Sequence, residues 1–137
     1  MKKVLFVCTG NTCRSQMAEG LLRHYFGKQF VPFSAGSHPS KIVNPRAVQV
    51  MAELEIDISH HQPKSIEKYL HQNFDFVITL CDAANEHCPV FHGDGKRLHW
   101  GMPDPYCAKG TEEEILAIYR NTRDKISEKI RLFLSEI

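Results

Sequence analysis

Short apolar runs alternate with amphipathic helical patterns along this chain, and this alternation constrains the fold more than any other feature. Four runs have the composition of β-strands: residues 3–8 (KVLFVC), 30–36 (FVPFSAG), 74–81 (FDFVITLC) and 96–100 (KRLHW). Between them, residues 14–27, 44–57 and 111–136 carry apolar side chains at helical spacing, and residues 64–72 predict a short helix. Such alternation predicts an α/β fold, a small doubly wound, four-stranded parallel sheet with helices on both faces.

Local signals set several of the expected boundaries. Asn44 and Pro45 have the pattern of an N-cap and a first helical residue, and Gly27 is expected to end the first helix. Pro32 places the second strand near a sheet edge, because proline cannot donate to a ladder. The last helix is expected to bury one apolar face: Ile115, Ile118, Tyr119, Ile126, Ile130, Phe133 and Leu134.

Length, charge and cysteine count exclude several classes of protein. The 137 residues predict one domain spanning residues 1–137. The formal net charge is +1, which argues against nucleic acid or an anionic membrane as a partner. No apolar run approaches the roughly 20 residues of a membrane helix, and the N-terminal run is too short for a signal peptide. An odd number of cysteines, five, predicts a reducing, cytoplasmic location; we also expect a monomer.

The loop between the first strand and the first helix has the composition of an anion-binding turn. Free N–H groups in such a loop and at a helix start converge on an anion. Gly10 allows a turn that other residues avoid, Asn11 tolerates left-handed geometry, and the guanidinium of Arg14 matches two oxygens of a tetrahedral oxyanion. The expected oxyanion-binding residues are Thr9, Gly10, Asn11, Thr12, Cys13 and Arg14, with Cys13 also packing inside the loop.

Cys8 stands at the base of this loop and is the candidate nucleophile. The loop N–H groups and Arg14 would stabilise its thiolate, and Ser15 could donate a further hydrogen bond to the sulfur. An inert buried thiol is the alternative, which the combination of cysteine, arginine and serine at this spacing disfavours. A leaving oxygen also needs a proton donor. Asp104 is the candidate, held between Pro103 and Pro105, although an isolated Asp-Pro is more often a turn.

Cys81 and Cys88 form a second candidate group. If the first and third strands are neighbours, about 4.8 Å apart, Cys8 and Cys81 end at the same sheet edge and can approach disulfide range. Seven helical residues would separate Cys88 from Cys81 by about 10.5 Å, so a disulfide between them requires the segment to unwind. The alternatives are two unrelated core thiols, or a zinc site on Cys81, His87, Cys88 and His92, which lacks a close cysteine pair.

These residues together resemble a known family. VCTGNTCRSQMAEG at 7–20 is similar to the signature loop of the low-molecular-weight protein tyrosine phosphatases and of the arsenate reductases built on that fold. The resemblance extends over nearly the whole chain, through SAG at 34–36, VITLCDAANEHCP at 77–89 and HWGMPDP at 99–105. It implies the phosphatase-like α/β fold and an oxyanion substrate.

Three features favour the thioredoxin-coupled arsenate reductases within this family. Gln16 follows Arg14-Ser15 where phosphatases usually have proline, and Cys88-Pro89 follows Cys81 at the reductase spacing. Residues 119–126 (YRNTRDKI) resemble the reductases' final helix. The sequence PDPY at 103–106 is instead phosphatase-like, and Tyr106 could stack on an aryl phosphate, which implies residual phosphatase activity.

The resemblance implies a relay of three thiols. Cys8 attacks arsenate while Asp104 protonates the leaving oxygen. Cys81 then attacks the adduct and releases arsenite, and Cys88 attacks Cys81, leaving a Cys81–Cys88 disulfide for reduced thioredoxin. The cycle needs no bound cofactor. Some such reductases hold potassium near residues matching Asn11, Glu19 and Ser34, but Lys64 falls near an expected acidic ligand, so no metal is assigned.

Two other functions stay open from the sequence. A low-molecular-weight protein tyrosine phosphatase would use Cys8 as the site of a phosphoenzyme, with Arg14 and Asp104, and would not need Cys88. A non-catalytic oxyanion- or metal-binding regulator would show no turnover. Glutaredoxin is the alternative reductant, although it would not require the Cys81–Cys88 pair.

Overall fold

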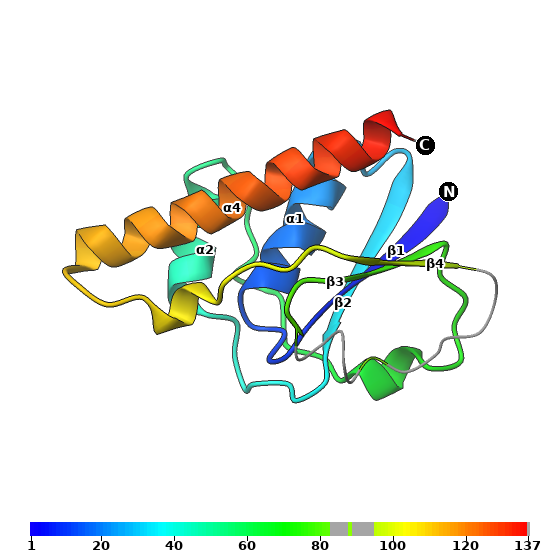
Figure 1. Ribbon diagram of the computed structural model, residues 1–137, viewed down its shortest axis with the longest axis horizontal. Helices are drawn as coiled ribbons and strands as arrows, with labels where there is room; N and C mark the ends of the chain where they lie inside the picture. The colour runs from blue at the N-terminus through cyan, green and yellow to red at the C-terminus, as the bar shows by residue number, and fades with distance from the viewer. Residues whose placement is uncertain (83–87, 89–94, 137) are drawn as a thin grey trace.

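The computed structural model describes residues 1–82, 88 and 95–136. Its centre is a four-stranded parallel sheet in the order β2-β1-β3-β4 (Figure 1). The strands are β1 (Lys2–Cys8), β2 (Phe30–Gly36), β3 (Phe76–Thr79) and β4 (Lys96–His99). The predicted sheet is therefore confirmed, including the place of β2 at an edge. The strand predicted over 74–81 is shorter, so Cys81 lies just beyond β3.

The helices begin largely where the sequence predicts and differ more at their ends. They are α1 (Arg14–Phe26), α2 (Pro45–Ala52) and α4 (Glu112–Ser135), with 3₁₀ turns η1 (Ile66–Tyr69) and η2 (Pro105–Cys107). The predicted helix 44–57 stops at Ala52 because Glu55 takes a left-handed backbone, φ 61°. The short helix expected over 64–72 is the 3₁₀ turn η1.

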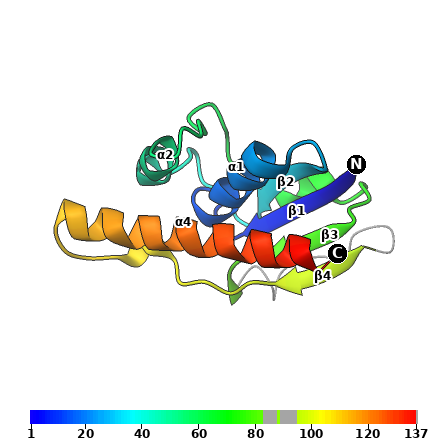
Figure 2. The same cartoon turned by 90° about the horizontal axis from the view of Figure 1, so that it is seen from above.

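The helices form a layer against one side of the sheet. α1 packs on β1 and β2, and α4 runs alongside both α1 and α2, as Figures 1 and 2 show from two directions. On the opposite face, Tyr69 of η1 packs edge-on against Phe33 of β2, with ring centroids 5.6 Å apart. In the described part of the chain, the helical cover of this second face is η1. None of the described helices is long and apolar enough to cross a membrane.

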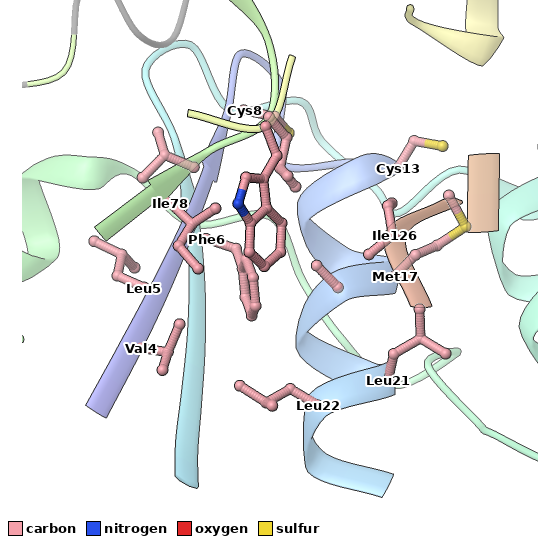
Figure 3. Close-up of a cluster of buried hydrophobic side chains, with 14 of the residues drawn as sticks. Val4, Leu5, Phe6, Cys8, Cys13, Met17, Leu21, Leu22, Ile78 and Ile126 are labelled. Atoms are coloured by element: carbon pink, nitrogen blue, oxygen red, sulfur yellow. The ribbon is translucent and has the colours of Figure 1, made fainter. Parts of the chain in front are cut away.

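An apolar core fills the space between the sheet and α1 and α4. Phe6 of β1 contacts Trp100, which follows β4, and Trp100 contacts Phe133 of α4; Figure 3 shows Phe6 among its neighbours. Ile118, expected in the apolar face of the last helix, is instead 47% exposed. Ile118 lies outside the stripe that α4 turns inward, which is Leu116, Tyr119, Thr122, Arg123, Ile126, Ile130 and Phe133.

Candidate active site

A pocket of about 550 Å³ lies at the carboxyl end of β1. Cys8, Arg14 and Asp104 all line it, although Asp104 is distant from the other two in sequence. Cys8 ends β1 and Cys13 precedes α1, at the same end of the apolar cluster (Figure 3). The remaining lining residues are Thr9, Gly10, Thr12, Cys13, His38, Ser40, Lys41, Ile42, Asn44, Pro45 and Tyr106.

Most carbonyl groups of the loop are occupied by backbone hydrogen bonds. Those of Cys8, Thr9, Gly10 and Thr12 accept hydrogen bonds of 2.8–3.3 Å from backbone N–H groups in the segment 37–44. In the described part of the chain, the loop N–H groups from Thr9 to Arg14 donate to no carbonyl. Unbonded N–H donors beside carbonyls that are already bonded are what an anion requires.

Asn11 takes the left-handed conformation in this loop, with φ 49°. We expected a special turn at Gly10 as well, but among the described glycines only Gly110 has positive φ. Gly10 is instead required for space, because a Cβ there would lie 2.9 Å from Ser40 Oγ. Close packing of Ser40 against the loop therefore favours glycine at position 10.

A chain of side-chain hydrogen bonds leads to the Cys8 sulfur. Asn11 Nδ2 donates to Ser15 Oγ at 2.7 Å, and Ser15 Oγ lies 2.8 Å from Cys8 Sγ. Because the Ser15 oxygen accepts from the amide, its own proton is free to point at the sulfur. All three residues are at most 2% exposed, so water does not compete for these bonds. The predicted contact between Ser15 and Cys8 is present.

Asn11 is held in turn by its amide oxygen. This atom accepts from Lys64 N at 2.8 Å and from Gln16 Nε2 at 3.1 Å. Gln16 is fully buried, and its own amide oxygen lies 2.9 Å from His61 Nδ1. The orientation of the Asn11 amide, and with it the Ser15 proton, is therefore fixed by the segment 61–64.

Arg14 crosses the floor of the pocket with only part of its guanidinium engaged. Nη1 donates to Met102 O at 2.9 Å, and Nη2 lies 3.6 Å from Asp104 Oδ2. Nε is buried and has no partner among the described residues. A buried donor without a partner is costly, and an oxygen of a bound oxyanion would satisfy it.

Asp104 reaches the pocket, which the sequence alone could not show. Its carboxylate caps the 3₁₀ turn η2 by accepting from Tyr106 N, at 3.0 Å through Oδ1. The other oxygen, Oδ2, faces Arg14. The carboxyl is 40% exposed, so it can exchange protons with solvent while staying next to the oxyanion loop.

The remaining loop cysteine has a packing role. Cys13 is 2% exposed, and burial is the main cause that raises its pKa far above the ordinary thiol value. The neighbouring Cys8 and Asp104 raise that pKa further, and Arg14 opposes them. Cys13 therefore stays a neutral thiol beside the pocket, while its N–H group remains part of the loop.

Cys81 and Cys88 are both buried thiols in this structure. Thr9 Oγ1, from the oxyanion loop, lies 3.2 Å from Cys81 Sγ, which ties Cys81 to the Cys8 end of the sheet. Burial raises the pKa of Cys88, and Arg97 lowers it by a smaller amount. The expected unwinding between the two cysteines, and the alternative zinc ligands His87 and His92, fall on residues outside the described part. The described residues contain no cluster of three or more metal-ligating side chains.

Two of the three residues that match a potassium site, Glu19 and Ser34, are bonded to each other. Ser34 Oγ donates to Glu19 Oε1 at 2.7 Å, and Lys64 Nζ lies 3.8 Å from the same oxygen. Arg23 Nη1 lies 2.9 Å from the other carboxylate oxygen. Because two protein cations neutralise this carboxylate, the donor set does not fit a potassium ion.

Sequence reasoning missed several contacts that shape the site. No signal marked the carbonyl of Met102 or the N–H of Lys64, because any residue type supplies them. Gln16 was marked by the resemblance alone, whereas its buried amide beside the loop is what fixes Asn11. His61 was given no role, although it contacts Gln16.

Comparison with known proteins places this geometry in a family. The family model described as low molecular weight phosphotyrosine protein phosphatase matches residues 3–137. An arsenate reductase of Halalkalibacterium halodurans is 45% identical over 132 residues, which cover 96% of this chain and 94% of the relative.

Solved structures agree with this assignment. An arsenate reductase in a phosphate-binding state matches with a TM-score of 0.81 and 30% identity, covering 100% of this chain and 99% of the other. A low molecular weight protein tyrosine phosphatase from T. tengcongensis matches with a TM-score of 0.76 and 29% identity, covering 100% of both chains. The chain therefore belongs to the low molecular weight phosphotyrosine protein phosphatase family, and within it to the arsenate reductases.

Proposed function

We propose that this protein reduces arsenate to arsenite by a Cys8–Cys81–Cys88 relay that thioredoxin regenerates. The observation that carries the proposal is the unpartnered buried Nε of Arg14, which lies in a loop of inward N–H groups around the sulfur of Cys8. Tetrahedral oxyanions satisfy exactly such a set of donors, and the thiol at its base is positioned to attack their central atom.

The first step joins arsenic to Cys8. The Cys8 thiolate attacks arsenate, and Asp104 gives its proton to the oxygen that leaves as water. Cys81 then attacks Cys8 Sγ, forming the Cys8–Cys81 disulfide, and the electron pair of the broken S–As bond stays on arsenic. Arsenic(V) becomes arsenic(III), and two thiols are oxidised to one disulfide. The contact between Thr9 and Cys81 supports this step, because it holds Cys81 beside the loop.

The last steps return Cys8 to its starting state. Cys88 attacks Cys81, so the Cys81–Cys88 bond forms and Cys8 leaves as a thiolate. The dithiol of thioredoxin then reduces Cys81–Cys88 by two further exchanges. The electrons come from thiols, so the cycle requires no bound cofactor. We propose that the protein is a single-domain monomer that works in the cytoplasm, where thioredoxin keeps thiols reduced.

Aryl phosphate hydrolysis is a second candidate activity. Tyr106 and Ile42 line the pocket and are 71% and 65% exposed, so they form an apolar rim above the oxyanion loop. An aryl ring could rest there while its phosphate binds the loop. Hydrolysis would use Cys8, Arg14 and Asp104 and would leave Cys81 and Cys88 unused.

One experiment separates the two activities. We would measure arsenite release and arsenate-dependent NADPH oxidation with thioredoxin and thioredoxin reductase, and aryl phosphate hydrolysis in parallel. Cys88→Ser should release about one arsenite per enzyme and then stop, because the Cys8–Cys81 disulfide cannot be passed on. The wild type and Cys88→Ser should hydrolyse the aryl phosphate weakly and at equal rates.

The exposed Cys107 supplies the matched control. Cys107→Ser makes the same chemical change outside the relay and should turn over like the wild type. Sustained arsenate turnover by Cys88→Ser would show that the relay is wrong. No arsenate turnover together with fast aryl phosphate hydrolysis would show that the protein works as a phosphatase.

A further inference from the structure

Two side chains of strand β4, those of Arg97 and His99, point to the same face of the sheet. Side chains alternate along a strand, so Arg97 and His99 share one face. His99 Nδ1 lies 2.8 Å from Thr79 Oγ1, its register partner on β3. Trp100, the next residue, turns the other way and packs on Phe6. Arg97 and His99 therefore lie on the face opposite α1 and α4.

These two side chains contact residues at or beside the relay cysteines Cys81 and Cys88. His99 Nε2 lies 2.9 Å from Oδ1 of Asp82, the residue directly after Cys81. Arg97 Nη1 donates to the backbone carbonyl of Cys88 at 3.2 Å. One strand that belongs to the sheet thus anchors the surroundings of both relay cysteines. The anchor at Cys88 carries a full positive charge.

The charge matters because of where Cys88 lies. Its thiol is 9% exposed, and burial raises its pKa, which disfavours the thiolate that thiol exchange requires. Of the described charged groups, Arg97 is the one that acts on this thiol, and it lowers the pKa. Arg97 is thus a cation that contacts the backbone of Cys88 and opposes the effect of burial on its thiol.

We propose that Arg97 is a positioning residue for the second thiol exchange, holding Cys88 by its carbonyl and stabilising its thiolate as it attacks Cys81. The inference rests on the proposed relay and concerns one step of it. In that step the Cys81–Cys88 bond forms, the Cys8–Cys81 bond breaks, and Cys8 takes the electron pair as a thiolate. The exchange needs no outside oxidant or reductant. Arg97 has no part in the attack of Cys8 on arsenate.

The test is a single turnover without thioredoxin. Enzyme is mixed with arsenate, quenched with acid at intervals and alkylated, and the Cys8–Cys81 and Cys81–Cys88 disulfides are counted by peptide mass spectrometry. In Arg97→Gln the Cys8–Cys81 disulfide should accumulate, and its conversion should slow roughly tenfold, with the pH profile of this step moved to higher pH. Arsenite release, which precedes the step, should keep its wild-type rate.

Two further variants make the result specific. Arg97→Lys keeps the charge and should restore most of the conversion rate, and Lys96→Gln removes a neighbouring exposed cation of β4 and should change nothing. Conversion by Arg97→Gln at the wild-type rate would overturn the inference, as would an equal slowing of arsenite release, which would mark general damage. If the wild type forms no Cys8–Cys81 disulfide at all, the relay itself is wrong and the inference falls with it.

Discussion

At the scale of single residues, the proton on Ser15 is the detail on which the proposed chemistry most depends. Asn11 occupies the Ser15 oxygen, so the hydroxyl donates to Cys8 Sγ across 2.8 Å in a site closed to water. A hydrogen bond to a charged partner contributes about 1.5–3 kcal/mol. We predict that Ser15→Ala slows the first attack on arsenate roughly 10- to 100-fold, measured as arsenite formed in a single turnover.

The control for this prediction is a serine outside the site. Ser59 is exposed and bonds to Asp57 in a turn far from the pocket lining, so Ser59→Ala should leave the rate unchanged. Alkylation of Cys8 by iodoacetamide should slow in Ser15→Ala by a similar factor, since the same thiolate is the nucleophile. Equal rates of alkylation in the two variants would show that Ser15 does not activate Cys8.

At the scale of secondary structure, the Asn44 side chain is one of several contacts that join α2 to α4. Asn44 Oδ1 accepts from Arg46 N and caps α2, and Asn44 Nδ2 donates to Tyr119 OH of α4 at 2.9 Å. Tyr119 is fully buried. We predict that Asn44→Ala lowers the free energy of unfolding by about 2 kcal/mol, one part from the lost cap and one from the lost hydrogen bond to the Tyr119 hydroxyl.

Urea denaturation measures this loss. Asn121→Ala is the matched control, because Asn121 is exposed within α4 and alanine is the better helix former. It should leave the stability unchanged or raise it slightly. Because Asn44 also lines the pocket, activity is not a clean measure of this loss, and the denaturation curve is the readout. A stability equal to that of Asn121→Ala would mean that the other contacts between α2 and α4 hold α2 in place without Asn44.

At the scale of the whole molecule, burial of His61 links stability to pH. Burial lowers the pKa of His61 in the folded protein; Glu19 opposes this, and His60, Arg23 and Lys64 add to it. As the pH falls through about 6.5, the unfolded chain binds a proton that the folded His61 does not. The contribution of His61 to the free energy of unfolding is therefore fully present above this pH and is lost progressively below it.

We predict that this decrease is smaller in His61→Gln. Urea denaturation at intervals between pH 7.5 and pH 5 would measure it, in a range above that where Glu53 and Glu112, whose pKa values are lowered by arginine partners, begin to titrate. His24→Gln replaces an exposed histidine and should follow the wild-type curve. Parallel curves for wild type and His61→Gln would show that burial of this imidazole costs nothing.

The elements that the sequence predicted well are those with a strong periodic pattern. The long helix α4, the buried β1 and the parallel order of the sheet follow from apolar spacing, because burial of one face dominates their stability. The errors lie where local backbone conformation decides, as at Glu55, which ends α2 early. Ile118 was misplaced because apolar character alone cannot say which stripe of a helix turns inward.

The sequence by itself determined the candidate nucleophile, the oxyanion loop and the type of fold, because cysteine, arginine and a polar strand-to-helix turn each carry local chemistry. Only the tertiary structure decided what aligns them. Asp104 reaches Arg14 across the pocket, the segment 61–64 orients Asn11, and Arg97 of β4 contacts the carbonyl of Cys88. These contacts join residues that are distant in sequence, and several use backbone atoms, whose positions depend on packing rather than on residue type.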